Sequence, residues 1–232
     1  MRGCRYWLLT ALLISHFSFL ICSVAAQDEP EYRLEVGAGV AMTTYLGDFN
    51  GNLTKEMQPA FALVTKYKMN PRMALGATLT YGHMKGSSKN TKTWYPETAE
   101  MPYSFNNQLI DLSLRYEYNF WAYGTGREYY GARRVAPFIA LGLGLTYADA
   151  HPGTVAASLP LGAGVKMKVS ERLNLTVDWT MHFTGTDRLD GIRDPYGITS
   201  SGLLKNTDCY SAFMLSLTYD IWEKCKTCNN DR

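Results

Sequence analysis

Large apolar residues alternate with small or polar residues along most of the chain, from Tyr32 to Trp222. In the first such segment the apolar positions include Leu34, Val36 and Val40, and Glu35 is among the residues between them. A period of two places successive side chains on opposite faces of a β-strand. The pattern predicts eight strands, at residues 32–42, 60–69, 73–82, 110–119, 139–147, 159–168, 173–183 and 212–221.

The two phases of the pattern differ in side-chain size. One phase is built of Leu, Ile, Tyr, Phe, Trp and Met, and the other largely of Gly, Ala, Ser and Thr. A soluble lipocalin-like barrel has the same period with its apolar face inside. However, the interior of an eight-stranded barrel is only just wide enough for side chains to fill, so the larger set does not fit there. We therefore predict an all-β fold, an eight-stranded antiparallel transmembrane β-barrel with its apolar phase facing lipid.

The connections between the predicted strands alternate in length. Residues 70–72 and 170–172 form tight turns, whereas residues 84–104 and 185–207 form long loops. Outer-membrane barrels have short periplasmic turns and longer external loops. An even number of strands then places both termini in the periplasm. Tyrosine and tryptophan near strand ends, such as Tyr118 and Trp222, suit a girdle at the membrane interface.

The first 26 residues have the features of a secretory signal peptide. Arg2 and Arg5 precede an apolar core at residues 6–22, and Val24, Ala25 and Ala26 supply a small-residue cleavage site. The alternatives are an uncleaved anchor helix and a lipoprotein modified at Cys22. We predict a signal peptide at residues 1–26, a barrel at residues 27–222 and a periplasmic C-terminal tail at residues 223–232. The predicted location is the outer membrane of a Gram-negative cell.

Removal of the signal peptide changes the charge balance. The chain has 23 Lys and Arg against 21 Asp and Glu, and the predicted signal peptide contains two of the arginines and no acidic residue. The mature chain is therefore neutral by formal charge. Such a chain has no general basic surface that would indicate nucleic-acid binding.

Several charged residues occupy the phase that is predicted to face the barrel interior. In so narrow a lumen they must pair or hold water, because burying a lone charge is very costly. We predict a paired network that fills the barrel as a structural plug; a small channel or a proton path is the alternative. The residues are Glu35, Lys66, Lys68, Asp111, Arg115, Glu117, Lys166, Lys168 and Asp178.

Catalysis is a further possibility, because some eight-stranded outer-membrane barrels modify lipid A with His, Ser and an acidic residue near the outer rim. Here His182 is followed by Thr184 and Asp187. A hydroxyl beside a histidine can form a nucleophile–base pair. Threonine is the less usual nucleophile, and the spacing defines no third member. We predict that the protein is not an enzyme and uses neither a cofactor nor a metal.

The connection at residues 121–134 is long for a periplasmic turn. It is either a solvated turn with interfacial tyrosines or a docking surface for a periplasmic partner, because exposed aromatic and Arg side chains are typical interface anchors. Its candidate contact residues are Arg127, Tyr129, Tyr130, Arg133 and Arg134.

Three cysteines remain in the predicted mature chain: Cys209, Cys225 and Cys228. Cys225 and Cys228 lie in the polar tail. The tail lacks the βαβ context of a thioredoxin-like site and the four ligands of a zinc site. A disulfide within the tail, or one to a partner protein, remains possible because the periplasm is oxidising. Cys209 is predicted near the outer end of the last strand, across the membrane from the tail.

Five short motifs carry a resemblance to a known family. They are Tyr45-Leu46-Gly47-Asp48, Pro137-Phe138-Ile139, Pro160-Leu161-Gly162-Ala163-Gly164-Val165-Lys166, Phe183-Thr184-x-Thr186-Asp187-x-Leu189-Asp190 and Asn206-x-Asp208-x-Tyr210. By their order and spacing, the chain resembles the PorG-like outer-membrane barrels of the Bacteroidetes type IX secretion system, a DUF6089-type family. The resemblance covers nearly all of the mature chain. Arg188 departs from it, because an aromatic residue is expected at that position.

The resemblance implies a role that the residues alone do not supply. Such proteins are thought to be non-enzymatic and to link a periplasmic ring, built from the PorK lipoprotein and PorN, to the outer membrane. We place the contact in the 121–134 connection and in the tail with Cys225 and Cys228. The alternatives are a small barrel of OmpA or OmpW type, with a structural or ligand-binding role, and a lipid A-modifying enzyme.

Overall fold

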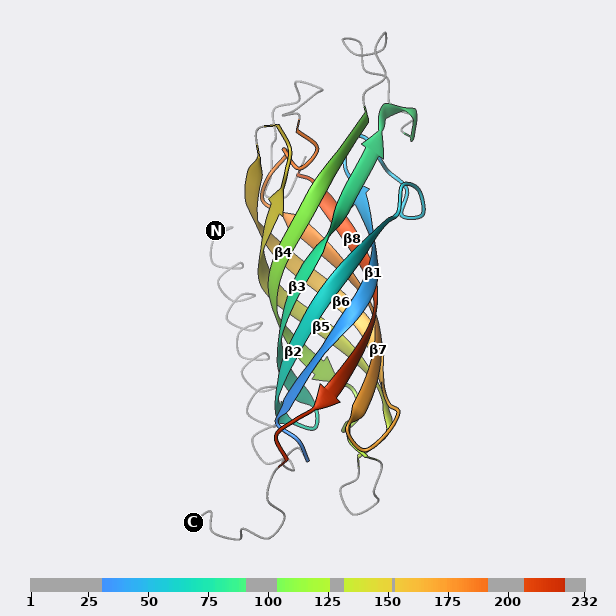
Figure 1. Cartoon of the computed structure of the whole chain (residues 1–232), viewed down its shortest axis with the longest axis vertical. Coiled ribbons are helices and arrows are strands. Elements are labelled where there is room, and N and C mark those ends of the chain that lie inside the picture. The colour runs from blue at the N-terminus through green and yellow to red at the C-terminus, as the bar shows by residue number, and fades with distance from the viewer. Residues whose placement is uncertain (1–30, 91–103, 126–131, 152, 192–206, 224–232) are drawn as a thin grey trace, which may run out of the picture.

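The chain forms a closed barrel of eight antiparallel strands (Figure 1). The computed structural model describes residues 31–90, 104–125, 132–151, 153–191 and 207–223. The predicted eight-stranded antiparallel barrel is therefore confirmed, and the periplasmic placement of both termini stays a prediction. The elements are β1 (Leu34–Leu46), β2 (Gln58–Asn70), β3 (Met73–Ser87), the short 3₁₀ helix η1 (Ser88–Asn90), β4 (Ser104–Asn119), β5 (Val135–Ala148), β6 (Thr154–Lys168), β7 (Leu173–Thr184) and β8 (Cys209–Asp220).

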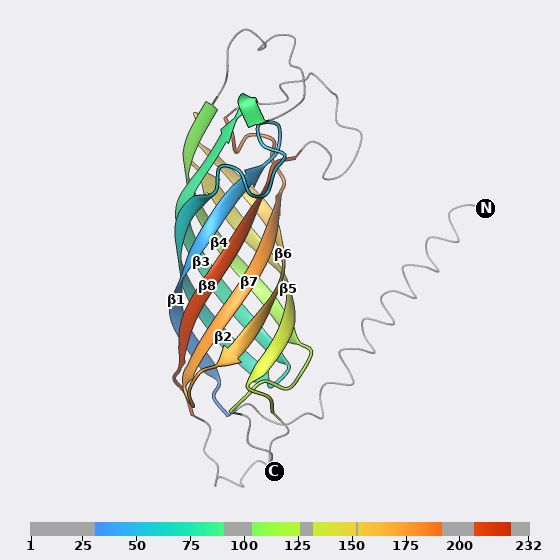
Figure 2. The same ribbon diagram turned by 90° about the vertical axis from the view of Figure 1, so that its right-hand side faces the viewer.

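Each strand pairs with the strands before and after it in the sequence, and β8 pairs with β1 to close the barrel (Figure 2). The closing register runs from Glu35 opposite Asp220 to Leu46 opposite Cys209. Closure satisfies the backbone hydrogen bonds that the two edge strands of an open sheet would expose. In the described part of the chain, no helix is long and apolar enough to cross a membrane.

The two ends of the barrel differ in their connections. At the end that we call the turn end, β1 begins and β8 ends, and the connections are residues 71–72, 120–134 and 169–172. At the opposite end, which we call the loop end, the connections are residues 47–57, 88–103, 149–153 and 185–208. The long connection at residues 120–134 is thus an exception at an end otherwise closed by short turns.

The outer wall of the barrel is apolar around its circumference. Phe61 on β2, Leu143 on β5 and Val155 on β6 expose 67%, 71% and 67% of their surfaces. Phe213 and Leu217 on β8 are also exposed. A monomeric soluble protein rarely exposes so large an apolar surface, which is the surface that lipid chains cover in a membrane barrel. The size argument from the sequence therefore assigns the outward face correctly along the middle of the strands.

At the loop end the strands extend further than the alternation predicts. β3 continues to Ser87 and β4 begins at Ser104, whereas the pattern predicts strands at 73–82 and 110–119. The outward positions there are polar, with Lys85 opposite Asn106 and His83 opposite Gln108. At this end the outward-facing residues are no longer apolar, but the backbone hydrogen bonds between β3 and β4 continue, because strand pairing does not require an apolar outer face.

The expectation that large apolar side chains do not fit inside the barrel is wrong at the loop end. A cluster of buried apolar residues, most of them large, fills the interior there, because the outer surface at this end is polar and only the lumen shields apolar side chains from water. Its members are Tyr45, Phe49, Met84, Phe105, Leu109, Ala148, Leu189 and Tyr210.

Tyr32 is not on the lipid face, where the alternation predicted it. It precedes β1 and is buried at the turn end, with only 7% of its surface exposed. The Lys168 ammonium lies 5.4 Å from the centre of its ring. Tyr32 still pairs with Glu223 in the β1–β8 register, but a bend at Arg33 separates it from β1, and the alternation of faces does not continue across this bend.

Candidate functional site

A column of charged side chains from β1, β2, β4, β6, β7 and β8 fills the barrel lumen. It contains all nine interior residues predicted from the sequence together with Asp220, and these ten are five acidic and five basic groups. Asp220 occupies the inward phase of the last strand, so the alternation already indicated its position. Equal numbers of opposite charges allow each buried charge to find a partner, which is the condition for burying them at all.

The end of the column next to the turn end centres on Asp220. Its two carboxylate oxygens contact the Lys68 and Lys168 ammonium groups, each at 2.5 Å. Lys68 also pairs with Glu35 at 3.1 Å, and Glu35 accepts a hydrogen bond from Thr218. These residues come from strands β1, β2, β6 and β8, so the network crosses the lumen and ties four strands together.

The middle of the column centres on Glu117 of β4. Its carboxylate pairs with Lys166 at 2.5 Å and with Lys66 at 3.4 Å. Both ammonium groups also lie over the Phe138 ring, at 4.6 Å for Lys166 and 5.6 Å for Lys66. Arg115, two residues before Glu117, pairs with Asp178 at 3.0 Å.

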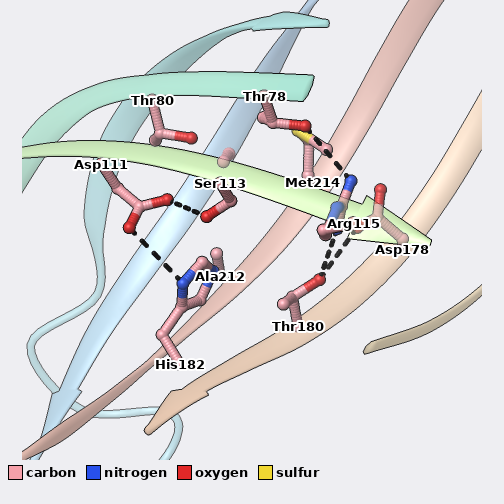
Figure 3. Close-up of a pocket in the computed structure, with 11 residues that line it drawn as sticks. Thr78, Thr80, Asp111, Ser113, Arg115, Asp178, Thr180, His182, Ala212 and Met214 are labelled. Carbon is pink, nitrogen blue, oxygen red and sulfur yellow. Dashed lines mark hydrogen bonds and ion pairs between the residues drawn. The ribbon is translucent and has the colours of Figure 1, made fainter. Parts of the chain in front are cut away.

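A small cavity lies beside Arg115 and Asp178 (Figure 3). Arg115 also donates to Thr180 at 2.8 Å and to Thr78 at 3.4 Å, and Asp111 and His182 line the other side. The cavity measures about 20 Å³, which is space for a water molecule or two. A space of this size is a packing void that admits no solute larger than water.

His182 lies at the loop-end side of this cavity. Its Nδ1 is 3.7 Å from the Asp111 carboxylate, and its ring stacks on Tyr210 at 4.3 Å. Thr184, the candidate nucleophile, instead donates its hydroxyl to the backbone carbonyl of Asp208 at 2.6 Å. His182 and Thr184 thus face different partners, and the geometry does not form the nucleophile–base pair that catalysis at this position would need.

A hydrogen-bonded group closes the lumen at the loop end. The Tyr45 hydroxyl donates to Asp208 at 2.5 Å and contacts Asp190 at 2.9 Å, and the Leu189 amide donates to Asp208 at 2.8 Å. Burial, with the neighbouring Asp190 charge, raises the pKa of Asp208 to about 8. Five residues from three of the motifs that carry the family resemblance therefore meet in this group and in the adjoining apolar cluster: Tyr45, Leu189, Asp190, Asp208 and Tyr210.

Tyr123 closes the lumen at the turn end. It is buried, its hydroxyl donates to Asn174 at 2.8 Å, and its ring lies 5.7 Å from both the Lys68 and the Lys168 ammonium groups. Burial and the negative charges of Glu35 and Asp220 raise the pKa of Tyr123. No strand periodicity covers this position, so the sequence did not indicate its role.

Trp121, Arg133 and Arg134 of the 120–134 connection form an exposed surface beside this lid. The Arg133 guanidinium lies 4.7 Å above the Trp121 ring, and both side chains are exposed. Arg134 is exposed too, and its Nε donates to the Thr125 carbonyl at 2.8 Å. Thr125 in turn donates to the Glu31 carboxylate at 2.5 Å.

The first residue of the predicted tail lies at the same end. Glu223 forms a β-bridge with Tyr32 and an ion pair with Arg172 at 3.0 Å. The 120–134 connection, the segment before β1 and the start of the tail thus share one end of the barrel, and Glu31 directly precedes the bridged Tyr32. We call the described residues 31–33, 71–72, 120–125, 132–134, 170–172 and 222–223 the turn-end surface.

Some predicted contact residues lie outside the described part of the chain. They are Arg127, Tyr129, Tyr130, Cys225 and Cys228. The remaining cysteine of the predicted mature chain, Cys209, is a free thiol at the start of β8. Among the described residues, no group of three or more His, Cys, Asp or Glu side chains is placed to hold a metal ion.

Comparison with known proteins gives one family match and several structural likenesses. The model of a family described as a domain of unknown function, DUF6089, matches residues 14–230. Neisserial surface protein A aligns at 14% identity over 81% of this chain and 97% of its own, with a TM-score of 0.48. Ail of Yersinia pestis aligns at 11% identity over 84% and 100%, with a TM-score of 0.45. OprG of Pseudomonas aeruginosa aligns at 10% identity over 84% and 99%, with a TM-score of 0.46. Comparison with curated proteins gives no significant match.

Proposed function

The chain belongs to the DUF6089 family, and we propose that it is a non-enzymatic outer-membrane component of the type IX protein secretion machinery. In this proposal the barrel anchors the periplasmic ring of PorK and PorN to the outer membrane. The turn end faces the periplasm, and the ring contacts the turn-end surface. The five motifs shared with PorG-like barrels, considered together with the properties of the two barrel ends, support this choice.

The filled lumen is the first argument for a role outside the barrel. Ten charged side chains and a buried aromatic residue, Tyr123, occupy the interior, and the cavity of about 20 Å³ beside Arg115 has room for only a water molecule or two. A barrel with a filled lumen can function without conducting solutes in two ways. It binds something at one of its ends, or it holds another component in the membrane.

The observation that carries the proposal is the composition of the turn-end surface. The sequence marked two separate segments as candidate contacts, the 121–134 connection and the tail. In the fold, the described parts of these segments lie at the same end of the barrel, with Tyr32 bridged to Glu223 and Glu31 bonded to Thr125. A partner that docks at this end reaches both segments at once, which suits an anchor better than either segment would alone.

Affinity purification with crosslinking from outer membranes tests the proposal. The tagged full chain should recover PorK and PorN above a tagged small barrel of OmpA type, which serves as the control. Deletion of residues 223–232, or replacement of Cys225 and Cys228 by serine, should weaken this recovery. The same should hold for combined charge reversal at Arg127, Arg133 and Arg134.

Each variant needs a control for folding, because a misassembled barrel would also lose its partner. Folded barrels resist unfolding in SDS unless they are heated, so equal gel mobility before heating shows that the variant is folded. Recovery of PorK and PorN no better than with the control barrel would leave the chain as a small barrel with a structural or ligand-binding role. Full recovery of PorK and PorN with every turn-end variant would show that the contact lies elsewhere on the barrel.

A further inference from the structure

Charged residues are distributed unequally between the two ends of the barrel. In the described part of the chain, the loop end has four basic residues against six acidic ones, at positions 48–56, 85–89, 149 and 187–208. The lumen between the ends is balanced. The turn end has an excess of two positive charges: Arg33, Arg72, Arg133, Arg134 and Arg172 against Glu31, Glu171 and Glu223.

The glutamates Glu31 and Glu223 at the turn end are engaged within the chain. Glu223 pairs with Arg172, and Glu31 accepts hydrogen bonds from both the hydroxyl and the backbone amide of Thr125, at 2.5 and 3.3 Å. Among the described residues, no carboxylate lies within ion-pair distance of Arg133 or Arg134. The positive charge of these two neighbouring side chains is therefore available to a ligand.

Contacts within the chain hold both arginines in place. The Arg133 guanidinium stacks on Trp121, and the Arg134 Nε–H is bonded to the Thr125 carbonyl. A guanidinium has five N–H donors, so stacking leaves the donors of Arg133 at its edge available and Arg134 keeps four. Side chains that are oriented before binding lose less conformational entropy when a carboxylate docks. Stacked arginines with adjacent aromatic residues are also common binding hot spots.

The geometry points to an acidic protein surface as the ligand of the turn end, with Arg133 and Arg134 as its main anchors; this inference rests on the proposed function, and the partner is the PorK–PorN ring. The argument against a lipid surface is that the turn-end surface extends toward the Tyr123 lid over the barrel mouth, where the half-buried Glu31 lies against the buried Thr125. Lipid headgroups reach the perimeter of a barrel but not its axis. Only a macromolecule in the aqueous compartment can contact both the perimeter and the mouth of the barrel.

A binding measurement with purified components tests this inference. The full mature chain is placed in phosphatidylcholine nanodiscs and titrated with the soluble PorK–PorN complex. Arg133→Glu should weaken binding by about tenfold or more, the effect of losing a hot-spot arginine. Arg133→Lys keeps the charge but loses the planar guanidinium. Its binding affinity should lie between those of Arg133→Glu and the wild type. Raising the salt from about 0.05 M to about 0.5 M NaCl should weaken the wild-type complex, because screening reduces exposed charge attraction.

The matched control is Arg188→Glu, which makes the same charge change at the exposed loop end. It should bind as the wild type does. Equal binding by Arg133→Glu and the wild type would overturn the acidic-surface inference and leave the anchoring function intact. Absence of any wild-type binding would overturn the anchoring function itself.

A lipid ligand gives a different result. In nanodiscs of mixed phosphatidylcholine and phosphatidylglycerol, it would enrich phosphatidylglycerol around the wild type but not around Arg133→Glu, while both bind the ring equally. That outcome would also overturn the inference. We expect no such enrichment.

Discussion

Individual residues in the lumen show how buried charge is tolerated in this barrel. Glu117 contacts two ammonium groups and Asp220 contacts two more, so each of these carboxylates bridges a lysine of β2 and a lysine of β6. At the loop end the arrangement is different, because Asp190 and Asp208 meet around the hydroxyl of Tyr45. Two acids sharing one donor favour protonation of one of them. The group should therefore respond to pH.

The stability of this loop-end group should fall as pH rises. The pKa of Asp208 is raised to about 8, so the folded state binds its proton more tightly than the unfolded state does. The stabilisation is complete below the ordinary carboxyl pKa and is lost as pH rises through the folded value. Between pH 7 and pH 9 the local opening equilibrium should increase by about tenfold. Hydrogen exchange of the Leu189 amide, corrected for its intrinsic pH dependence, measures this.

Asp208→Asn supplies the comparison, because an amide of the same shape cannot ionise. Its exchange should be independent of pH over this range once the intrinsic rate is removed. A wild-type profile as flat as that of the Asn variant would show that Asp208 does not titrate here.

At the scale of the strands, small inward residues set how closely neighbouring strands and the lumen contents pack. A Cβ built on Gly37 of β1 would lie 2.1 Å from the Leu217 carbonyl oxygen and 2.5 Å from the Thr218 Cα on β8. These are backbone atoms, which cannot move aside as the end of a flexible side chain can. By contrast, a Cβ on Gly51, in the loop after β1, would meet nothing within 4 Å.

Gly37→Ala should therefore destabilise the barrel, whereas Gly51→Ala should not. The alanine methyl group forces the β1–β8 pair apart at the seam that closes the barrel, at a cost of about 1–3 kcal/mol, typical of overpacking. The urea midpoint of unfolding in detergent micelles, read from the fraction of protein that keeps folded gel mobility, measures the effect. Identical midpoints for the two variants would contradict the close approach of β1 and β8.

At the scale of the whole molecule, three successive layers close the barrel. The loop-end cluster with Tyr45, the charged column with Glu117 and the lid formed by Tyr123 each block the lumen at a different level. The apolar wall places this closed body in a membrane. The surfaces that other proteins can contact are therefore the two ends of the barrel.

The complete protein should not conduct ions. In planar lipid bilayers we expect no steady unit conductance from the wild type, with an outer-membrane porin as the positive control. Tyr123→Ala, which removes the lid, should also be silent, because the charged column and the loop-end cluster still fill the lumen. Discrete, ohmic steps from the wild type would mean that the network opens and that the protein is a channel.

The sequence by itself determined the strand count, the closed antiparallel fold and the outward face in the middle of the wall. Those features follow from short-range regularities: a period of two and a size difference between the phases. The same regularities placed Glu35, Lys66 and Asp178 inside. They could not show which charges meet, because the pairs join strands far apart in the sequence.

Only the tertiary structure decided what happens where the alternation stops. Tyr123 lies outside the predicted strands, so no periodicity indicates that it is buried at the mouth of the barrel, and for Tyr32 the alternation predicted the opposite face. The meeting of Tyr45 with Asp190 and Asp208, and the shared end of Glu31, Thr125 and Glu223, depend on closure of β1 against β8. Closure brings distant segments to a common end of the barrel, and local sequence patterns contain no information on such contacts.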